Sequence, residues 1–420
     1  MLGAARPRVG VPAAADLADS LRGAGAEPVP LDMPAGRPKG GVALAREWVA
    51  DATQIFCARQ HLDGLLLAAE EPEELAGLVL VALRLNLPAV AGPCGDVYLS
   101  TALAALGLLP LAGDPASVAV EVARSGGPRT RDLVDDFSLV NALRAGLSLG
   151  GGPELLVHLS AIAGEAASPG FLRSLRVITP ETTLLAGPDS GWFAEHGVAG
   201  LLARLGDALN DTGTVSGRLR ELVLPSSAVP EPPRTEGSHL GFVEARASGA
   251  SALCRVYGGE TEISGECRVC HSQKFAVDMV EEGSLEAPSL LVVGGCGPRG
   301  GPGLARLERL SQVLERDGLG DCVPVITDGL PPRFSRGIWI SLFSPEGPVG
   351  GVLGRLRDGD PLRINLREGR IRTGVGAGEF ASRDPYEFDD RAGAGAGAGA
   401  GYAARYARTA LPGLGGAGFG

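Results

Sequence analysis

The stretch Gly294–Gly303, reading GGCGPRGGPG, directly follows the apolar run Ser289–Val293. Two similar stretches follow it, CVPVITDG at Cys322–Gly329 and GIWISLFSPEG at Gly337–Gly347. Each is a short run of β-branched or apolar residues that ends in a glycine-rich break, a pattern typical of loops at strand ends. Backbone N–H groups in such loops can approach an anion closely, which predicts a site for a small acidic ligand. The alternative is that these glycines only form turns in an all-β segment.

The candidate residues for binding this small acidic ligand lie in the first two of these breaks. They are Gly297, Arg299, Gly300, Gly301 and Asp328. Arginines near the loops (Arg299, Arg333 and Arg336) could pair with a carboxylate or a phosphate. The alternative is that these arginines are solvated surface charges.

Length and composition indicate two domains with large cores. The chain has 420 residues, 45% of them hydrophobic, with 64 Gly and 31 Pro. Its formal net charge of −11 argues against nucleic acid or an anionic membrane as a main partner. No run of 18 apolar residues and no signal peptide is evident, and seven scattered cysteines fit a reducing compartment. We therefore expect a cytoplasmic protein.

The first half of the chain alternates helical and strand patterns. Apolar residues recur at helical spacing around Leu17, from Leu44 to Phe56 and from Leu75 to Leu83, and short apolar runs stand at Leu62–Ala69 and Leu87–Gly92. This order predicts an α/β domain with a parallel sheet and crossover helices, followed by mostly helical segments to about residue 167.

The second half begins after a proline-rich break and indicates a β-sandwich or barrel. Short Val-, Ile- and Leu-rich runs recur there, and a pair of hairpins is expected to turn at Asp358-Gly359 and at Glu368-Gly369. An Ala–Gly repeat then has the composition of a flexible linker. The expected division is an α/β domain over 1–222, a linker over 223–236, a barrel over 237–391, the Ala–Gly linker over 392–401 and a C-terminal docking segment over 402–420.

Motifs along nearly the whole chain resemble those of the dihydroxy-acid dehydratase family, which also includes the 6-phosphogluconate and sugar-acid dehydratases. The matching pieces are AREWVADA (Ala45–Ala52), ALRLNLP (Ala82–Pro88), CGDVYLSTALAALGL (Cys94–Leu108), GTVSGRLRELV (Gly213–Val223), GPRGGPGL (Gly297–Leu304), VITDG (Val325–Gly329) and SPEGPVGGVLGRLRDGD (Ser344–Asp360). The resemblance implies an N-terminal α/β domain, a C-terminal β-barrel domain, and a dimer whose active sites lie where the two domains meet.

The resemblance also implies a specific chemistry, the dehydration of a 2,3-dihydroxy acid to a 2-oxo acid. In this family three cysteine thiolates hold an iron–sulfur cluster, and one open iron acts as a Lewis acid on the departing hydroxyl. A magnesium ion, held by carboxylates and a carboxylated lysine, orients the substrate, and a serine alkoxide removes the proton at C2.

This chain departs from the family pattern at most of those positions. Ala13 stands where the first cluster cysteine is expected, and an ungapped match places Glu71, Pro72 and Glu73 on the family's cysteine, aspartate and lysine. The third cysteine remains, as Cys94. One thiolate cannot hold a cluster that needs three, so the cluster is expected to be lost.

The magnesium and base positions are altered as well. Cys296 stands where the family has a magnesium-binding glutamate, and as a cysteine it is a speculative metal ligand. Asp32 is a loose match to another magnesium-binding carboxylate of the family. Lys39 and Lys274 are the only lysines of the chain, which leaves almost no source for a carboxylated lysine. The serine base corresponds to Pro332, or to Ser335 after a slip of three residues; Ser335 is the catalytic candidate.

Two further motifs are candidate sites. Cys267–His271 spells C-x-x-C-H, which could attach haem, or bind zinc with a fourth ligand such as His239 or Cys254. The glycines at Gly150–Glu154, before an apolar helix, could bind an anion or simply cap that helix. His158 on that helix is expected to be a packed core histidine.

Two functions remain open. The first is a dehydratase-family scaffold with dismantled metal sites and no cofactor, which acts as a binding subunit or pairs with itself or with an intact dehydratase. The alternative is an active hydro-lyase that uses the family's cluster and magnesium.

Overall fold

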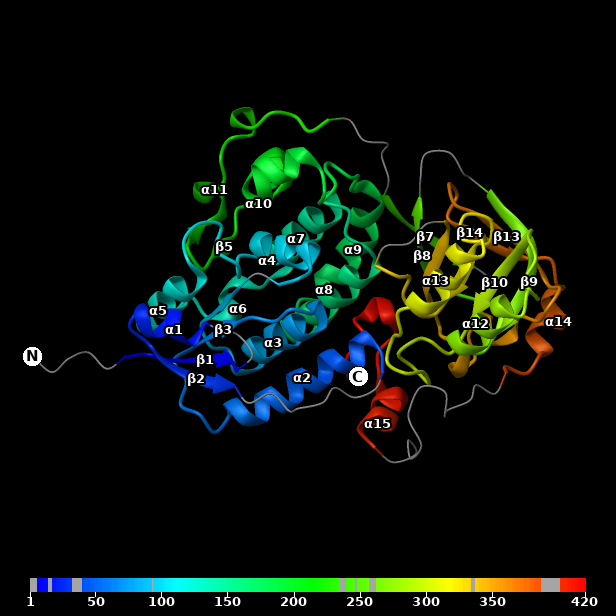
Figure 1. Cartoon of the computed structure of the whole chain (residues 1–420), viewed down its shortest axis with the longest axis horizontal. Coiled ribbons are helices and arrows are strands. Elements are labelled where there is room, and N and C mark those ends of the chain that lie inside the picture. The colour runs from blue at the N-terminus through cyan, green and yellow to red at the C-terminus, as the bar shows by residue number, and fades with distance from the viewer. Residues whose placement is uncertain are drawn as a thin grey trace, which may run out of the picture. The chain divides into compact units, whose positions relative to one another are not determined.

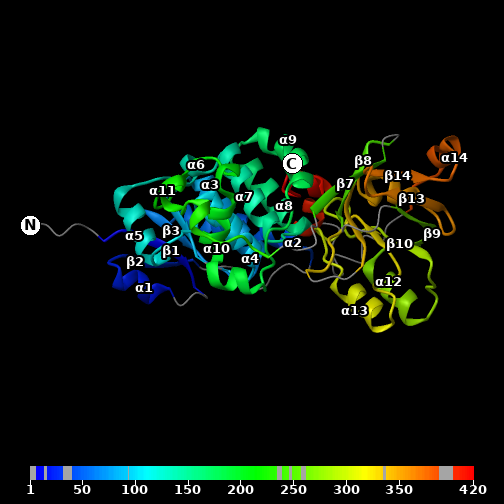
Figure 2. The same ribbon diagram turned by 90° about the horizontal axis from the view of Figure 1, so that it is seen from above.

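The computed structural model describes residues 6–13, 17–31, 40–92, 94–233, 239–245, 248–256, 262–333, 337–386 and 401–420. Asp32, Lys39, Ser335 and Arg336, and the Ala–Gly repeat up to Ala400, lie outside the described residues. The chain forms two compact units. The first comprises residues 1–37, 46–151 and 158–235, and the second comprises residues 236–420 together with the short stretches 38–45 and 152–157. Figures 1 and 2 show the first unit in blue to green and the barrel of the second in yellow-green to orange.

The first unit contains a four-stranded parallel sheet in the order β2-β1-β3-β4. The strands are β1 (Arg8–Pro12), β2 (Glu27–Leu31), β3 (Gly64–Leu67) and β4 (Ala89–Ala91). The chain moves outward from β1 to β2 and then returns past β1 to β3, so the direction of winding reverses between β1 and β3. Right-handed crossovers therefore put α1 (Ala18–Gly23) on one face of the sheet and both α2 (Val42–Cys57) and α3 (Pro72–Leu85) on the other.

Helices complete this unit. They are α4 (Val97–Leu106), α5 (Pro115–Ser125), α6 (Thr130–Leu133), α7 (Asp136–Ser148), α8 (Pro153–Glu165, of which residues 153–157 count with the second unit), α9 (Pro169–Glu181), α10 (Gly191–Leu205) and α11 (Leu219–Leu222), with the two-residue strands β5 (Gly213–Thr214) and β6 (Gly217–Arg218) and the 3₁₀ turns η1 (Gly206–Ala208) and η2 (Ser226–Ala228). Helix α5 packs on β1, β3 and β4, and Gly64 allows this approach because a Cβ there would lie 2.9 Å from the Cβ of Ala123. The predicted α/β class is confirmed.

The second unit is a closed eight-stranded barrel in the order β10-β11-β12-β8-β7-β14-β13-β9. Its strands are β7 (His239–Ala245), β8 (Ala250–Val256), β9 (Glu262–Cys270), β10 (Ser289–Val293), β11 (Val325–Thr327), β12 (Trp339–Ser344), β13 (Pro361–Asn365) and β14 (Arg370–Thr373). The other elements are α12 (Gln273–Glu281), α13 (Glu308–Arg316), α14 (Ala377–Ser382), α15 (Tyr402–Thr409), and the 3₁₀ turns η3 (Gly347–Val349), η4 (Val352–Arg355) and η5 (Gly413–Gly415). The predicted barrel is therefore confirmed.

Four neighbouring barrel strands, β9 to β12, are parallel. Helix α12 connects β9 to β10, and α13 connects β10 to β11. Side chains along β10 alternate between two hydrophobic cores. Leu290 and Val292 face the barrel interior, whereas Leu291 and Val293 pack in a second cluster with residues of α12 and α13. Because β10, β11 and β12 are parallel neighbours, the three glycine-rich breaks of the sequence lie at the same edge of the barrel.

The predicted pair of hairpins is half right. β13 and β14 form the hairpin that turns near Glu368-Gly369. The hairpin predicted at Asp358-Gly359 is wrong, because no strand precedes it and β13 pairs instead with β9. Asp358 has another role there, since its side chain accepts a hydrogen bond of 2.7 Å from the backbone N–H of Val269.

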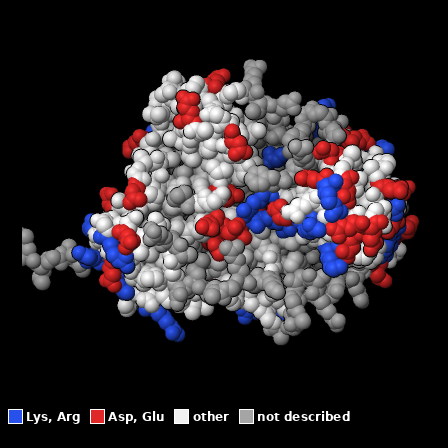
Figure 3. Space-filling model, in the orientation of Figure 1, with Lys and Arg blue, Asp and Glu red and all other residues white. Residues whose placement is uncertain are grey.

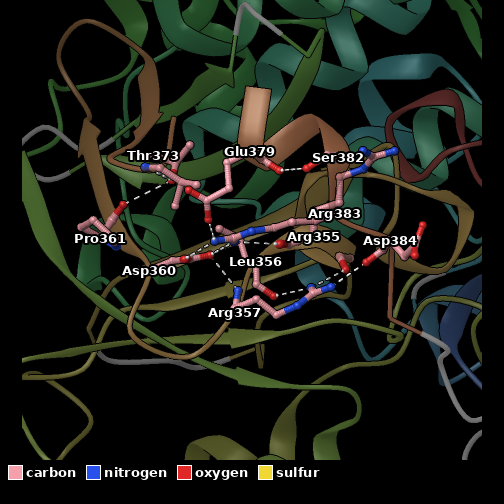
Figure 4. A network of polar contacts seen from close by, with 12 residues as sticks. Arg355, Leu356, Arg357, Asp360, Pro361, Thr373, Glu379, Ser382, Arg383 and Asp384 are labelled. Carbon is pink, nitrogen blue, oxygen red and sulfur yellow. Dashed lines mark hydrogen bonds and ion pairs between the residues drawn. The ribbon is translucent and has the colours of Figure 1, made fainter. Parts of the chain in front are cut away.

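An arginine network holds α14 on the barrel (Figure 4). The Arg383 guanidinium lies 3.1 Å from Oδ1 of Asp360 and 2.7 Å from Oε1 of Glu379. The backbone N–H of Arg357 donates to the carboxylate of Asp360 as well, and the guanidinium of Arg357 stacks 4.0 Å from the ring centre of Tyr386. These contacts fix the segment that leads into the Ala–Gly repeat.

The surface charge is mixed. On the face shown in Figure 3, blue and red side chains alternate over the barrel unit, while broad areas of the first unit are uncharged. Within the described ranges, no helix is both long and apolar enough to cross a membrane.

Candidate functional site

The edge of the barrel where β10, β11 and β12 end gathers several candidate residues of the second unit. The loop after β10 begins at Gly294, Asp328 directly follows β11, and Glu346 follows β12. The carboxylate of Asp328 accepts hydrogen bonds from the backbone N–H groups of Gly295 (3.1 Å), Cys296 (2.8 Å) and Gly347 (3.3 Å). The anion that these amides bind is thus supplied by the chain itself.

The first loop is closed by its own backbone. Leu304 N–H donates to Gly297 O, and Ala305 N–H donates to Cys296 O at 2.8 Å. Gly297 must be glycine, because a Cβ there would lie 2.8 Å from Cγ of Glu346 and 3.2 Å from the backbone O of Asp328. Gly301 packs against Gly297 O in the same way, with a Cβ position 2.4 Å away. These tight contacts explain the glycine-rich composition.

Glu346 is a buried acid that the sequence analysis missed. It is 1% exposed, and neither carboxylate oxygen has a hydrogen-bond partner among the described residues. Burial raises its pKa to about 7; the charge of Asp328 adds to the rise, and Arg299 and the amides of Glu346 and Gly413 offset part of it. The sequence signal that could have identified Glu346 is its position just after an apolar strand. That strand, β12, is parallel to β11, which precedes Asp328.

Asp328 and Glu346 therefore form a buried pair of acids. Burial also raises the pKa of Asp328 to about 6, although its three amide donors favour the ionised form. Such a pair attracts positive charge or hydrogen-bond donors more readily than an anion. The half-buried Arg299 is the predicted residue of this loop that could still favour the small acidic ligand expected from the sequence.

Cys296 lies beneath this loop in the cluster formed with α12 and α13, and it is 2% exposed. Burial strongly raises the pKa of its thiol. A thiol must lose its proton to bind a metal, so this environment opposes the speculative role as a ligand.

The sheet of the first unit brings together the three positions that the resemblance implies for cluster ligands. Parallel pairing places the ends of β1, β3 and β4 in one row, so they lie within about 10 Å of each other. Ala13 follows β1, Glu71 precedes α3 in the loop after β3, and Cys94 follows β4. The last two loops are joined by the hydrogen bond from Gly95 N–H to Glu70 O at 2.9 Å. The winding reverses between β1 and β3, and ligands of open α/β sheets bind at such a switch point.

Cys94 itself is half-buried at the start of α4. Its sulfur accepts hydrogen bonds from Asp96 N–H (3.3 Å) and from the Ser100 hydroxyl (3.5 Å). Asp96 caps α4 by accepting from Leu99 N–H at 2.7 Å. The thiol of Cys94 is therefore the one sulfur at this edge of the sheet among the described residues.

The C-x-x-C-H motif does not form a zinc site. Cys267 and Cys270 are three residues apart on β9, so their side chains lie on opposite faces of the strand. Cys267 belongs to the barrel core and Cys270 to the cluster under α12 and α13. The ring of His271 packs 4.0 Å from that of Tyr386. Within the described ranges, no three His, Cys, Asp or Glu side chains lie close enough together to hold a metal ion.

The remaining candidate residues are buried in the core, form an ion pair or a backbone hydrogen bond, or lie on the surface. His158 is 1% exposed on α8, as a core histidine would be. Glu154, in the second unit, pairs with Arg306, whose Nε lies 2.7 Å from its Oε2. Arg333 is exposed, and Gly300 donates its backbone N–H to Ala407 O at 2.9 Å.

A parallel α/β sheet with its switch point at β1 and β3, followed in the chain by a mixed closed barrel, defines a two-unit α/β-plus-barrel protein. Residues 231–417 match the family model described as dihydroxy-acid/6-phosphogluconate dehydratase, C-terminal. The chain is 26% identical over 426 residues to a dihydroxy-acid dehydratase of Geotalea daltonii, covering 80% of this chain and 77% of that one. Those of Pelobacter propionicus (26%; 78% and 75% covered) and Synechococcus (24%; 81% and 77% covered) are similar. Residues 231–417 thus belong to the family of dihydroxy-acid/6-phosphogluconate dehydratase C-terminal domains, and the chain as a whole is similar to dihydroxy-acid dehydratases.

Proposed function

We propose that this protein keeps the dehydratase scaffold without the family's iron–sulfur cluster and acts in the cytoplasm as a non-catalytic binding or partner subunit. The observation that supports this best is the donor set at the ends of β1, β3 and β4. A row of strand ends suited to three thiolates offers the methyl group of Ala13, the carboxylate of Glu71 and the thiol of Cys94. One soft donor does not fit a cluster of this kind.

The other cysteines do not readily replace the missing donors. Burial raises the pKa of Cys254 and of Cys267 to about 12, and that of Cys57 to about 11. Their thiols pack among apolar side chains and stay protonated at neutral pH, whereas a cluster needs thiolates. Cys322 is exposed on the barrel unit.

The donors for magnesium are a poor fit as well. Lys274, one of the two lysines, is a surface residue with an 83% exposed side chain that pairs with Asp278 at 2.6 Å. Cys296 supplies a buried neutral thiol where the family pattern has a carboxylate. We therefore assign no reaction step to either metal group.

Anaerobic reconstitution with iron and sulfide tests this proposal. The expected product is colourless and holds no stoichiometric iron, while the dehydratase of Geotalea daltonii serves as a parallel control. A brown protein with about two irons per chain would favour the alternative function, an active hydro-lyase. Retention of Cys94 and the names of the relatives support that alternative, and turnover of a 2,3-dihydroxy acid would establish it.

Pairing with an intact dehydratase, or with a second copy, is the partner that the family's dimer implies. Co-expression of a tagged copy of this chain with an intact dehydratase should yield a mixed dimer that co-purifies in a fixed ratio. Homodimers alone, or monomers, would contradict the mixed assembly.

A further inference from the structure

The last 20 residues of the chain, 401–420, form a module that closes on itself. Helix α15 is followed by a turn, and the chain returns so that Leu411 N–H donates to Gly418 O at 2.8 Å. Tyr406 is 0% exposed, and its hydroxyl donates to Ala417 O at 2.5 Å. Phe419 packs edge-on against Tyr402 and Tyr406, with ring centres 5.6 and 5.5 Å away. We call this segment the C-terminal hook.

The hook rests on the barrel edge that holds the buried acids. Gly300 in the loop after β10 donates its N–H to Ala407 O at 2.9 Å, and η5 packs on β12. Gly413 allows this packing, because a Cβ there would lie 2.9 Å from Cδ2 of Leu342. Leu342 itself has a left-handed backbone with φ of 53°, a costly conformation that tends to occur at functional sites.

The hook also lies close to Glu346. The amide of Gly413 is close enough to offset part of the rise in the pKa of Glu346. The sequence from Ala392 to Gly401, which ties the hook to the barrel, contains only alanine and glycine. That part of the tether offers no side chain larger than a methyl group for packing, so the hook depends on its own contacts to stay docked.

We propose that the C-terminal hook is a detachable cap, and that the barrel edge formed by Gly300, Leu342 and Glu346 is its docking surface. The partner of this surface is the chain's own residues 401–420, which bind it as a preformed module. Undocking exposes the carboxylate of Glu346 while the barrel stays folded. This inference is independent of the absence of a cluster.

Hydrogen exchange on a protein that lacks residues 401–420 tests the proposal. The amides of 295–301 should exchange at least about tenfold faster than in the full chain, while β9 and β10 stay protected. A synthetic peptide of residues 401–420 should bind in a saturable manner and restore the protection. A truncated protein that is folded but does not bind the peptide would overturn the proposal, as would unchanged exchange of the loop.

A full-length variant covers the case in which the truncated protein does not fold. Gly413→Val places a branched side chain against Leu342 and should release the same loop amides without changing the barrel. The matched control is Gly415→Ala, whose Cβ would lie 3.7 Å from Leu411 and Pro412 within the hook itself. Equal exchange in the two variants would contradict docking through Gly413.

Discussion

Asp328 and Glu346 are both buried acids at the same barrel edge, but they differ in their partners. Three backbone N–H groups donate hydrogen bonds to the carboxylate of Asp328, whereas that of Glu346 accepts none within hydrogen-bond distance among the described residues. Burying an acid without partners favours its protonated form, which explains why the pKa of Glu346 rises to about 7. The ionised form of Glu346 thus opposes folding of this unit at alkaline pH.

The first prediction concerns the pH dependence of stability. The pKa of Glu346 is raised from 4.5 to about 7 in the folded state. Its contribution to the free energy of unfolding is therefore complete below pH 4.5 and is lost as the pH rises to about 7. Between pH 4.5 and 7.5 the wild-type protein should lose about 3 kcal/mol of unfolding free energy through Glu346, and Glu346→Gln should not show this loss. Urea unfolding across this range measures the effect, with the exposed Glu286→Gln as control. The same pH slope in wild type and in Glu346→Gln would contradict the raised pKa.

Sequence patterns identified part of this site. The glycine-rich loop and Asp328 stood out because short apolar runs ended at both, and the structure brings them together. Glu346 was missed because its importance depends on burial, which one acidic residue after an apolar run does not reveal. The expected anion site also changes, because Asp328 uses the amides of Gly295 and Cys296.

Secondary-structure elements could be predicted where the pattern is local. Apolar spacing from Leu44 to Phe56 corresponds to α2, and Leu62–Ala69 contains β3. The parallel order β9 to β12 could not be predicted, because strand order depends on contacts between distant segments. The false hairpin at Asp358-Gly359 has the same origin, since the turn residues are present but β13 pairs with the distant β9 on one side and with β14 on the other.

The second prediction concerns how α14 is held. Asp360 is 6% exposed and pairs with Arg383, so Arg383→Met leaves a buried carboxylate without its charged partner. We expect a loss of about 1–3 kcal/mol in unfolding free energy and faster amide exchange in α14. The control is Arg363→Met, which breaks a pair whose side chains are 69% and 45% exposed and should cost at most about 0.5 kcal/mol. Equal costs would show that the network in Figure 4 does not hold α14.

At the scale of the whole molecule, the resemblance predicted both units of the fold from motifs spread along the chain. Core positions and turn glycines maintain such a fold with little regard to the chemistry of the site, so motifs of this kind remain recognisable at 26% identity to the dehydratase of Geotalea daltonii. The cluster depends instead on a few individual side chains. In the function that we propose, Ala13 and Glu71 stand in place of cluster ligands while the sheet keeps the strand order β2-β1-β3-β4.

The third prediction follows from this separation of scaffold and chemistry. If the strand ends still have the geometry of a cluster site, restoring the donors should restore binding. The double variant Ala13→Cys/Glu71→Cys, together with Cys94, should take up about two irons per chain on anaerobic reconstitution and become coloured. Each single variant offers two thiols and should bind clearly less.

Iron and sulfide content and the visible spectrum measure the outcome, and circular dichroism checks that each variant is folded. Glu71 is the N-cap residue of α3, but its side chain makes no capping hydrogen bond, so the substitution should leave that helix intact. A folded double variant that stays free of iron would mean that the strand ends have lost the geometry as well as the thiols. Iron in the wild-type protein at the same level would instead mean that cysteines elsewhere in the chain supply the donors, and that the scaffold never lost its cluster.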